Sequence, residues 1–168
     1  MKRKLMFAIA SLALMLCGSL GCDIIDELDK PDYITVTVDA FANVTIGKWI
    51  SGQNVVVPWP NTQVQISIVK AGGERVDAVK TTDSYGVTES VVGTFKLYRE
   101  QNIQVLVSVT PNSAIPEELG GGGYDPARHF VNNAWEELTW DQVYASRDFG
   151  ETYSWYTTVH ATADVTER

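Results

Sequence analysis

Hydrophobic and polar side chains alternate along the chain from Tyr33 onward. Every second residue in this first stretch is apolar, and Val44 and Ile46 keep the same parity as Ile34, Val36, Val38 and Ala40. Successive side chains of a strand point to opposite faces of a sheet. This period of two therefore predicts a strand with one buried face.

Several more segments before Pro111 carry a strand signal. Val64, Ile66 and Ile68 alternate with polar residues, and the turn Ala71–Glu74 predicts a returning partner strand. A short run, Val55–Val57, is expected to be buried and to stop at Pro58. The other expected strands are Arg75–Thr81, Val87–Leu97 and Ile103–Val109. Many short strands with frequent turns predict an all-β fold, here a single sandwich of about seven strands.

Residues 111–150 depart from this pattern, and we interpret them as an insertion or long crossover before a final strand. Gly120–Gly123 is a run of four glycines that a packed core would not accommodate. Thr139 and Gln142 have the spacing of a capping box, which predicts a short helix, although a strand also fits the residues. The β-rich stretch Thr152–Ala163 is expected to return and close a sheet.

The N-terminus has the order of an export signal. Met1–Lys4 is basic, Leu5–Leu16 is apolar except for Ser11, and small residues follow. Sixteen residues from Leu5 to Leu20 fall short of the roughly 18 to 20 that span a bilayer. We therefore expect residues 1–21 to be a cleaved signal peptide, with an uncleaved membrane anchor as the alternative.

The stretch Ser19-Leu20-Gly21-Cys22 resembles the lipobox of bacterial lipoproteins. This resemblance implies cleavage before Cys22, lipidation of its thiol and attachment to a membrane through acyl chains. Cys17 follows the bulky Leu16 and would leave with the signal, so Cys22 would be the only cysteine of the mature chain. Asp23 is similar to the retention signal of proteobacterial lipoproteins, which implies the outer face of the cytoplasmic membrane rather than the outer membrane.

Charge changes the list of expected partners. Removing residues 1–21 leaves 10 of the 13 basic residues against 21 acidic ones, a formal charge near −11. Such an excess of acid disfavours nucleic acid as a partner and any polybasic attachment to anionic lipid. Residues 22–32 are acidic and end near Pro31, so we expect a solvated tether there and the sandwich domain in residues 33–168.

Residues 60–97 resemble the prealbumin-like sandwiches, which include transthyretin-like domains and the regulatory domains of some carboxypeptidases. The matching motifs are Pro60-Asn61-Thr62-Gln63-Val64-Gln65-Ile66, Thr81-Thr82-Asp83-Ser84-Tyr85-Gly86 and Gly93-Thr94-Phe95-Lys96-Leu97. In such a pattern Gly86 allows a positive φ at a tight turn. The resemblance implies an immunoglobulin-like or prealbumin-like sandwich and no particular chemistry.

Catalytic signatures are not recognisable in the sequence, and no cofactor or metal site is expected. The chain contains no Gly-x-Ser-x-Gly, Walker loop, HExxH or cysteine pair. His129 follows Asp125-Pro126-Ala127-Arg128, which we interpret as a polar turn, with a site as the alternative. His160 is expected to face outward from a strand or to be satisfied by a neighbour. The adjacent pairs Glu117–Glu118 and Glu136–Glu137 point apart on any regular element, which indicates solvated surface.

Nine of the seventeen aromatic residues gather between residues 124 and 156. Either they cover an open part of the sandwich, or they form an exposed platform for a glycan or protein. The candidate ligand-binding residues are Trp135, Trp140 and Tyr144, and Trp155 is expected to be more buried. The sequence thus predicts a non-catalytic interaction module of the cell envelope. The alternative is an envelope enzyme or glycan-binding protein with its site in the insertion.

Overall fold

The computed structural model describes residues 30–110, 113–146 and 151–166. The predicted signal peptide, Cys22 and most of the tether lie outside the described residues. Residues 33–168 form one compact unit of two sheets, which confirms the all-β sandwich. No described helix is long and apolar enough to cross a membrane.

The described residues contain nine strands, where the sequence pattern predicted about seven. The strands are β1 (Tyr33–Ile50), β2 (Gln53–Pro58), β3 (Gln63–Lys70), β4 (Arg75–Thr81), β5 (Val91–Tyr98), β6 (Asn102–Val109), β7 (Phe130–Asn132), β8 (Ala134–Thr139) and β9 (Thr152–Asp164). A 3-10 turn, η1 (Glu117–Leu119), and the helix α2 (Trp140–Ser146) complete the regular elements.

Sheet 1 is built around β1, which is long enough to pair with three strands. On one edge, β5 pairs with residues 33–40 of β1 and β2 pairs with residues 45–50. On the other edge, β9 runs parallel to β1 from Thr35 to Gly47, and β7 pairs with the end of β9. Sheet 2 has the order β4-β3-β6-β8, with all neighbours antiparallel.

The segment Gly86–Thr88 fills the gap that β5 and β2 leave along β1. Val44 N–H donates to the Gly86 carbonyl over 2.8 Å, and Thr88 exchanges bonds with both backbone groups of Ala42. Gly86 has a φ of +73°, as the tight turn in its motif predicted. The backbone groups of β1 are therefore satisfied in the stretch where it has no strand on this edge.

The core lies between the two sheets and follows the predicted alternation. Even-numbered residues of β1 from Ile34 to Ile46 are buried, while their odd-numbered neighbours are half-buried up to Thr45. β3 and β6 contribute Val64, Ile66, Ile68, Ile103, Val105 and Val107 from the other side. Apolar area removed from water stabilises this arrangement, at roughly 25 cal/mol per Å².

Two sequence predictions about individual segments are wrong. Val55–Val57 is no buried run, because β2 pairs with the end of β1 in a ribbon and Val56 is 54% exposed. Residues 111–150 are not wholly outside the sandwich, because β8 forms the edge of sheet 2 and β7 the edge of sheet 1. These two strands account for the excess over the predicted number.

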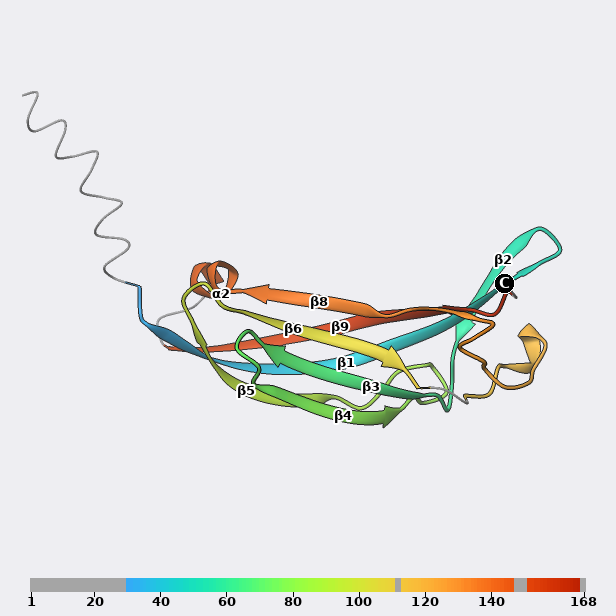
Figure 1. Ribbon diagram of the computed structural model, residues 1–168, viewed down its shortest axis with the longest axis horizontal. Helices are drawn as coiled ribbons and strands as arrows, with labels where there is room; N and C mark the ends of the chain where they lie inside the picture. The colour runs from blue at the N-terminus through green and yellow to red at the C-terminus, as the bar shows by residue number, and fades with distance from the viewer. Residues whose placement is uncertain (1–29, 111–112, 147–150, 167–168) are drawn as a thin grey trace, which may run out of the picture. The chain divides into compact units, whose positions relative to one another are not determined.

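The predicted short helix is present as α2, and its capping box is formed. Thr139 N–H donates to Gln142 Oε1 over 2.8 Å, and Gln142 N–H points back to Thr139 Oγ1 at 3.4 Å. These two reciprocal bonds satisfy backbone donors that the first helical turn leaves free. Figure 1 shows α2 at the end of the sandwich where β1 begins, and the β1–β2 ribbon at the opposite end.

Candidate functional site

The structure separates the three predicted ligand-binding residues. Trp135 is 58% exposed, whereas Trp140 is 4% exposed and belongs to the core. Tyr144 is half-buried and stacks on Trp140, with ring centroids 6.2 Å apart. The prediction that Trp140 belongs to an exposed binding platform is therefore wrong, because the protein itself already covers the indole ring. Cys22, the predicted lipidation site, lies outside the described residues.

The other aromatics of the cluster are divided in the same way. Tyr124 is buried, Phe130 and Tyr156 are exposed, and Trp155 is half-buried, which makes it more buried than Trp135 as predicted. Phe149 lies outside the described residues. The cluster is thus partly core and partly surface, and it does not form one continuous face.

Trp135 lies on the outer face of sheet 2, the face opposite the core. The register places Trp135 beside Leu106 of β6, and Leu106 beside Ser67 of β3. Glu137 on the same face accepts hydrogen bonds from the amides of Asn102 and Gln104. An exposed indole on a face of amides, carboxylates and hydroxyls is one candidate surface.

On the same face, Arg75 and Ser67 both hydrogen-bond to Oδ1 of Asp77 over 2.5 Å. These two hydrogen bonds, the one from Arg75 first, lower the pKa of the Asp77 carboxyl below its usual value. The ionised carboxylate is thus favoured in the folded state. Its stabilising effect is present above the pKa of the unfolded chain, about 3.9, and is lost as the pH falls through the lower folded value.

Asp77→Asn is therefore expected to lower the melting temperature slightly at pH 5 to 7 and to have less effect as the pH falls below about 4. The effect is small because the pair is exposed to solvent. Thermal unfolding of both proteins between pH 3 and pH 7 measures it. A difference that grows towards pH 3 would contradict the assignment.

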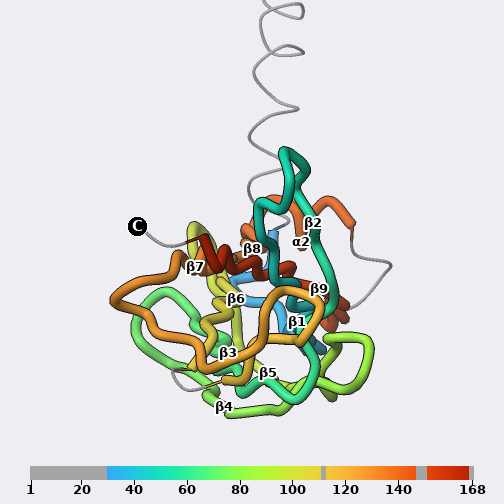
Figure 2. Tube along the Cα trace, turned by 90° about the vertical axis from the view of Figure 1, so that its right-hand side faces the viewer, coloured from blue at the N-terminus to red at the C-terminus, as the bar shows by residue number. Residues whose placement is uncertain are grey.

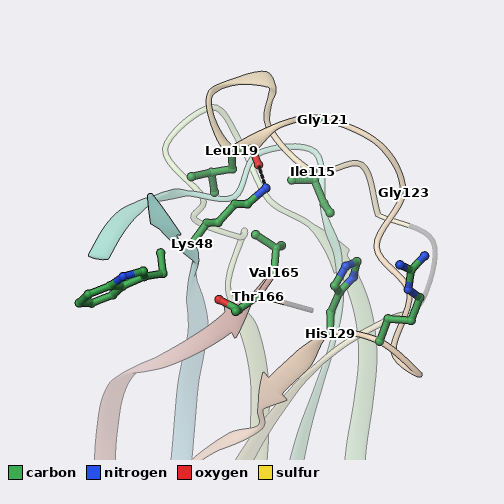
Figure 3. Close-up of a pocket in the computed structure, with 10 residues that line it drawn as sticks. Lys48, Ile115, Leu119, Gly121, Gly123, His129, Val165 and Thr166 are labelled. Atoms are coloured by element: carbon green, nitrogen blue, oxygen red, sulfur yellow. Dashed lines mark hydrogen bonds between the residues drawn. The ribbon is translucent and has the colours of Figure 1, made fainter. Parts of the chain in front are cut away.

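A second candidate site is a cavity at the end of the sandwich remote from Tyr33. We call it the distal pocket; its volume is about 450 Å³. Figure 2 looks at this end of the molecule, and Figure 3 shows the lining side chains. The lining residues are Lys48, Trp49, Ile115, Leu119, Gly121, Gly123, Arg128, His129, Val165 and Thr166. They come from β1, the loop before β7 and the C-terminal segment.

The loop that covers the distal pocket is fixed to the core by Trp59. This indole is fully buried, and its Nε1–H donates to the Ala114 carbonyl over 2.7 Å. Tyr124, at the other end of the loop, packs edge-on against Trp59 with centroids 5.2 Å apart. Ala114 and Gly123 form a β-bridge that closes the loop at its base. The glycine run is thus part of an ordered structure at its two ends.

Lys48 is the next residue of β1 after Ile46 on the inward-facing side of the strand, and it lies at the open end of the sandwich. Its ammonium donates to the Leu119 carbonyl over 3.1 Å, which leaves further N–H donors of the same group. A Cβ on Gly120 would approach Lys48 Nζ to 3.2 Å, so a glycine lets the loop lie close to the amine. In Figure 3, Lys48 and His129 reach the pocket from opposite sides.

His129 is oriented by its own turn. The backbone N–H of Asp125 donates to His129 Nδ1 over 2.9 Å, and the ring packs against Tyr124. A nitrogen that accepts a hydrogen bond carries no proton, so the neutral ring holds its proton on Nε2. Arg128 lies next to it in the pocket lining. Lys48, Arg128 and His129 thus all belong to the lining of the distal pocket.

Sequence reasoning missed Lys48, and it favoured a polar turn over a site for the segment from Asp125 to His129, which includes Arg128. The available signal was a lysine in an inward parity position, two residues beyond Ile46. The glycine run ahead of Arg128 and His129 was a second signal. Neither signal by itself indicates a pocket. Lys48 and the glycine run are about 70 residues apart in the sequence and meet only in the folded chain.

The other candidate catalytic and metal-binding residues do not come together in the described part of the chain. Glu136 and Glu137 occupy successive positions of β8 and point to opposite faces of sheet 2, as expected. His160 is exposed on β9, also as expected. No group of three or more His, Cys, Asp or Glu in the described part of the chain is placed to hold a metal ion. A scan of protein-family models and a search of curated proteins find no match to the chain.

Proposed function

We propose that the chain is an exported lipoprotein of the cell envelope, held to a membrane by acyl chains on Cys22, with a non-catalytic binding module in residues 33–168. The order of basic, apolar and small residues before Cys22 supports the anchor. More than one acyl chain is needed for stable attachment, which a lipobox modification would supply. Asp23 supports a position on the outer face of the cytoplasmic membrane.

The observation that carries the binding role is the distal pocket. Its volume lies within the roughly 300–1,000 Å³ of small-molecule sites, and polar donors converge on it. Lys48 is fifteen residues along β1 from Tyr33, where the domain begins, a distance of roughly 50 Å at the rise of a strand. The pocket therefore lies at the end of the domain remote from Tyr33, the residue at which the predicted tether joins.

We also propose that the sandwich is prealbumin-like. The support is the positive φ of Gly86 in the motif that carries the resemblance. This relation implies a scaffold and does not identify a ligand.

A glycan-binding face around Trp135 is the second candidate. It is favoured by the 58% exposure of this indole on the same face as Glu137 and the amides of Asn102 and Gln104. Aromatic rings supply rigid contact area at interfaces, and polar side chains around them fix orientation.

Retention on envelope material distinguishes the two candidates. The lipoprotein, purified in non-ionic detergent, is mixed with delipidated, insoluble envelope fragments and sedimented. We expect cosedimentation that the double variant Lys48→Gln/Arg128→Gln weakens and Trp135→Ala leaves unchanged. The reverse pattern would transfer the binding role to the outer face of sheet 2. Absence of cosedimentation for the wild type would contradict a binding module for insoluble envelope components.

The anchor has a separate test with an internal control. Cells given a labelled fatty acid are expected to label the wild-type chain and the Cys17→Ala variant but not Cys22→Ala, because the acyl chains need the Cys22 thiol. Gel fluorography of the immunoprecipitated chain measures the label. Label that persists in Cys22→Ala, or is lost in Cys17→Ala, would refute lipidation at Cys22.

A further inference from the structure

The edge of sheet 1 along β9 carries no strand over most of its length. β7 pairs only with the end of β9, and residues 152–161 have β1 as their one strand partner in the described part of the chain. Just before β9, the Glu151 carbonyl accepts a hydrogen bond from Thr35 N–H over 2.7 Å. Just after it, Val165 N–H donates to the Gly47 carbonyl over 3.0 Å.

These two hydrogen bonds show which backbone groups of β9 face away from β1. Odd-numbered residues direct N–H and C=O towards β1, so the even-numbered residues between them direct both groups to the other edge. We call this stretch the open edge, and its members are Thr152, Ser154, Tyr156, Thr158 and His160. The open edge therefore offers donors and acceptors to one further strand.

The open edge lacks the residues that usually protect the rim of a sheet. Proteins discourage pairing at an exposed edge with charged side chains or proline. Residues 152–161 contain no Lys, Arg, Asp, Glu or Pro. Other edge strands do carry such residues, namely Arg75 in β4, Lys96 in β5 and Pro58 in β2. The composition of β9 thus leaves its edge receptive to a strand.

Beside the open edge, the core side of β8 is uncovered. Glu136 lies directly opposite Val105 of β6, so the two side chains point to the same face of sheet 2. Val105 is fully buried in the core, whereas Glu136 is exposed. β9 contacts both β6 and β8 (Figure 1), and no described strand beyond the open edge covers β8 at this point. Sheet 1 therefore has room for one strand opposite Glu136.

The core side of β9 is also incompletely covered. Tyr153 and Trp155 face the core but are only half-buried, while Val159 and Ala161, further along the same side of β9, are buried. A strand added at the open edge would remove apolar area of these two aromatic side chains from water, which favours its binding.

We infer that the open edge binds an extended peptide segment of a partner protein, which joins sheet 1 as a further strand. The peptide backbone pairs with the even-numbered residues of β9. Its inward side chains are apolar and cover Trp155, and one inward side chain is basic and faces Glu136. In this mode of recognition, main-chain hydrogen bonds supply affinity and alternate side chains supply specificity.

Charge complementarity identifies the occupant. Glu136 places a carboxylate beside the open edge, and the chain carries 21 acidic against 13 basic residues. An acidic surface attracts a basic segment and disfavours a second copy of the same acidic chain. The open edge is separate from the distal pocket, so this inference goes beyond the proposed function.

A display library of random nonapeptides, selected on the lipoprotein in non-ionic detergent, tests the inference. We expect the enriched peptides to alternate apolar and polar residues and to carry Lys or Arg at one position of the apolar series. Fluorescence anisotropy of a labelled synthetic copy then measures affinity. Absence of enriched peptides, or enrichment without the alternation and the basic residue, would overturn the inference.

Ser154→Pro tests the backbone pairing. Ser154 is exposed and its N–H belongs to the open edge, a position where a strand tolerates proline. Loss of this donor is expected to weaken binding of the selected peptide about tenfold. Ser154→Ala keeps the N–H and should bind as the wild type does. Melting temperatures show whether each variant is folded.

Glu136→Lys tests the charge. Placing a cation opposite the basic side chain is expected to weaken binding of the selected peptide about tenfold, and a new selection should enrich Asp or Glu in its place. Glu137→Lys makes the same charge change on the opposite face of β8 and should leave both the affinity and the selection unchanged.

Wild-type affinity in Ser154→Pro or in Glu136→Lys would overturn the inference. Loss of peptide binding in Lys48→Gln/Arg128→Gln would place the peptide in the distal pocket and would overturn it as well. Ultracentrifugation of the lipoprotein in density-matched detergent examines the remaining occupant. A dimer that Ser154→Pro dissociates would assign the open edge to a second copy of the chain instead of a partner peptide.

Discussion

Replacing Gly86 with alanine is expected to lower the free energy of unfolding by at least about 3 kcal/mol. Gly86 has a φ of +73°, a region that costs an L-residue energy. A Cβ at this position would lie 2.4 Å from the Val44 carbonyl oxygen and 3.0 Å from Trp59 N. Both are backbone atoms hydrogen-bonded to each other, so neither moves without loss of a bond that closes the edge of β1. Urea unfolding followed by tryptophan emission measures the loss.

Gly52→Ala is the matched control for this prediction. Gly52 also has a positive φ, +82°, but a Cβ there would meet no atom within 4 Å. Its replacement is expected to cost only the conformational strain, about 1–2 kcal/mol. Equal losses for the two variants would show that strain alone acts at Gly86 and that the close approach to β1 is irrelevant.

Trp140→Ala is expected to cost about 3 to 5 kcal/mol, the usual range for a buried tryptophan truncated to alanine. Trp140 is 4% exposed and stacks on Tyr144, and its removal opens a cavity between α2 and the core. The same unfolding measurement applies. An unchanged dependence on urea concentration would show that the loss comes from the native packing and not from a changed unfolded state.

Trp135→Ala is the control, because this residue has the same side chain on the neighbouring strand but is 58% exposed. Surface substitutions usually change stability by no more than about 0.5 kcal/mol. In single-tryptophan variants, Trp135 should emit to the red and be quenched by acrylamide, and Trp140 should emit to the blue and resist quenching. A large stability loss for Trp135→Ala would mean that this indole is buried by some partner.

The alternation of residue types predicted much of the sandwich. The parity of Ile34 to Ile46 identified the buried face of β1, and the clean alternations in β3 and β6 identified their inward residues. Thr139 and Gln142 located the start of α2 because a capping box depends on neighbouring backbone groups only. Where local geometry decides the outcome, local sequence was sufficient.

The alternation of hydrophobic and polar residues did not predict which distant segments pair with each other. Val55–Val57 has the composition of a buried strand, but its position in the ribbon with the end of β1 exposes Val56. Thr152–Ala163 was expected to close a sheet, and it does so by a parallel pairing with β1 that no periodicity indicates. Partner choice depends on loop lengths and long-range packing, which a period of two does not encode.

By itself, the sequence determined the fold class, the faces of the main strands and the short helix, because alternation and capping act over a few residues. It also supplied the predicted anchor at Cys22. Only the tertiary structure decided that Trp140 is core and Trp135 is surface. The side chains of β8 can be assigned to an inner or an outer face only once this strand is placed at the edge of sheet 2. The tertiary structure alone placed Lys48, Arg128 and His129 in the lining of one pocket, because a pocket forms where segments that are distant in the sequence meet in the folded chain.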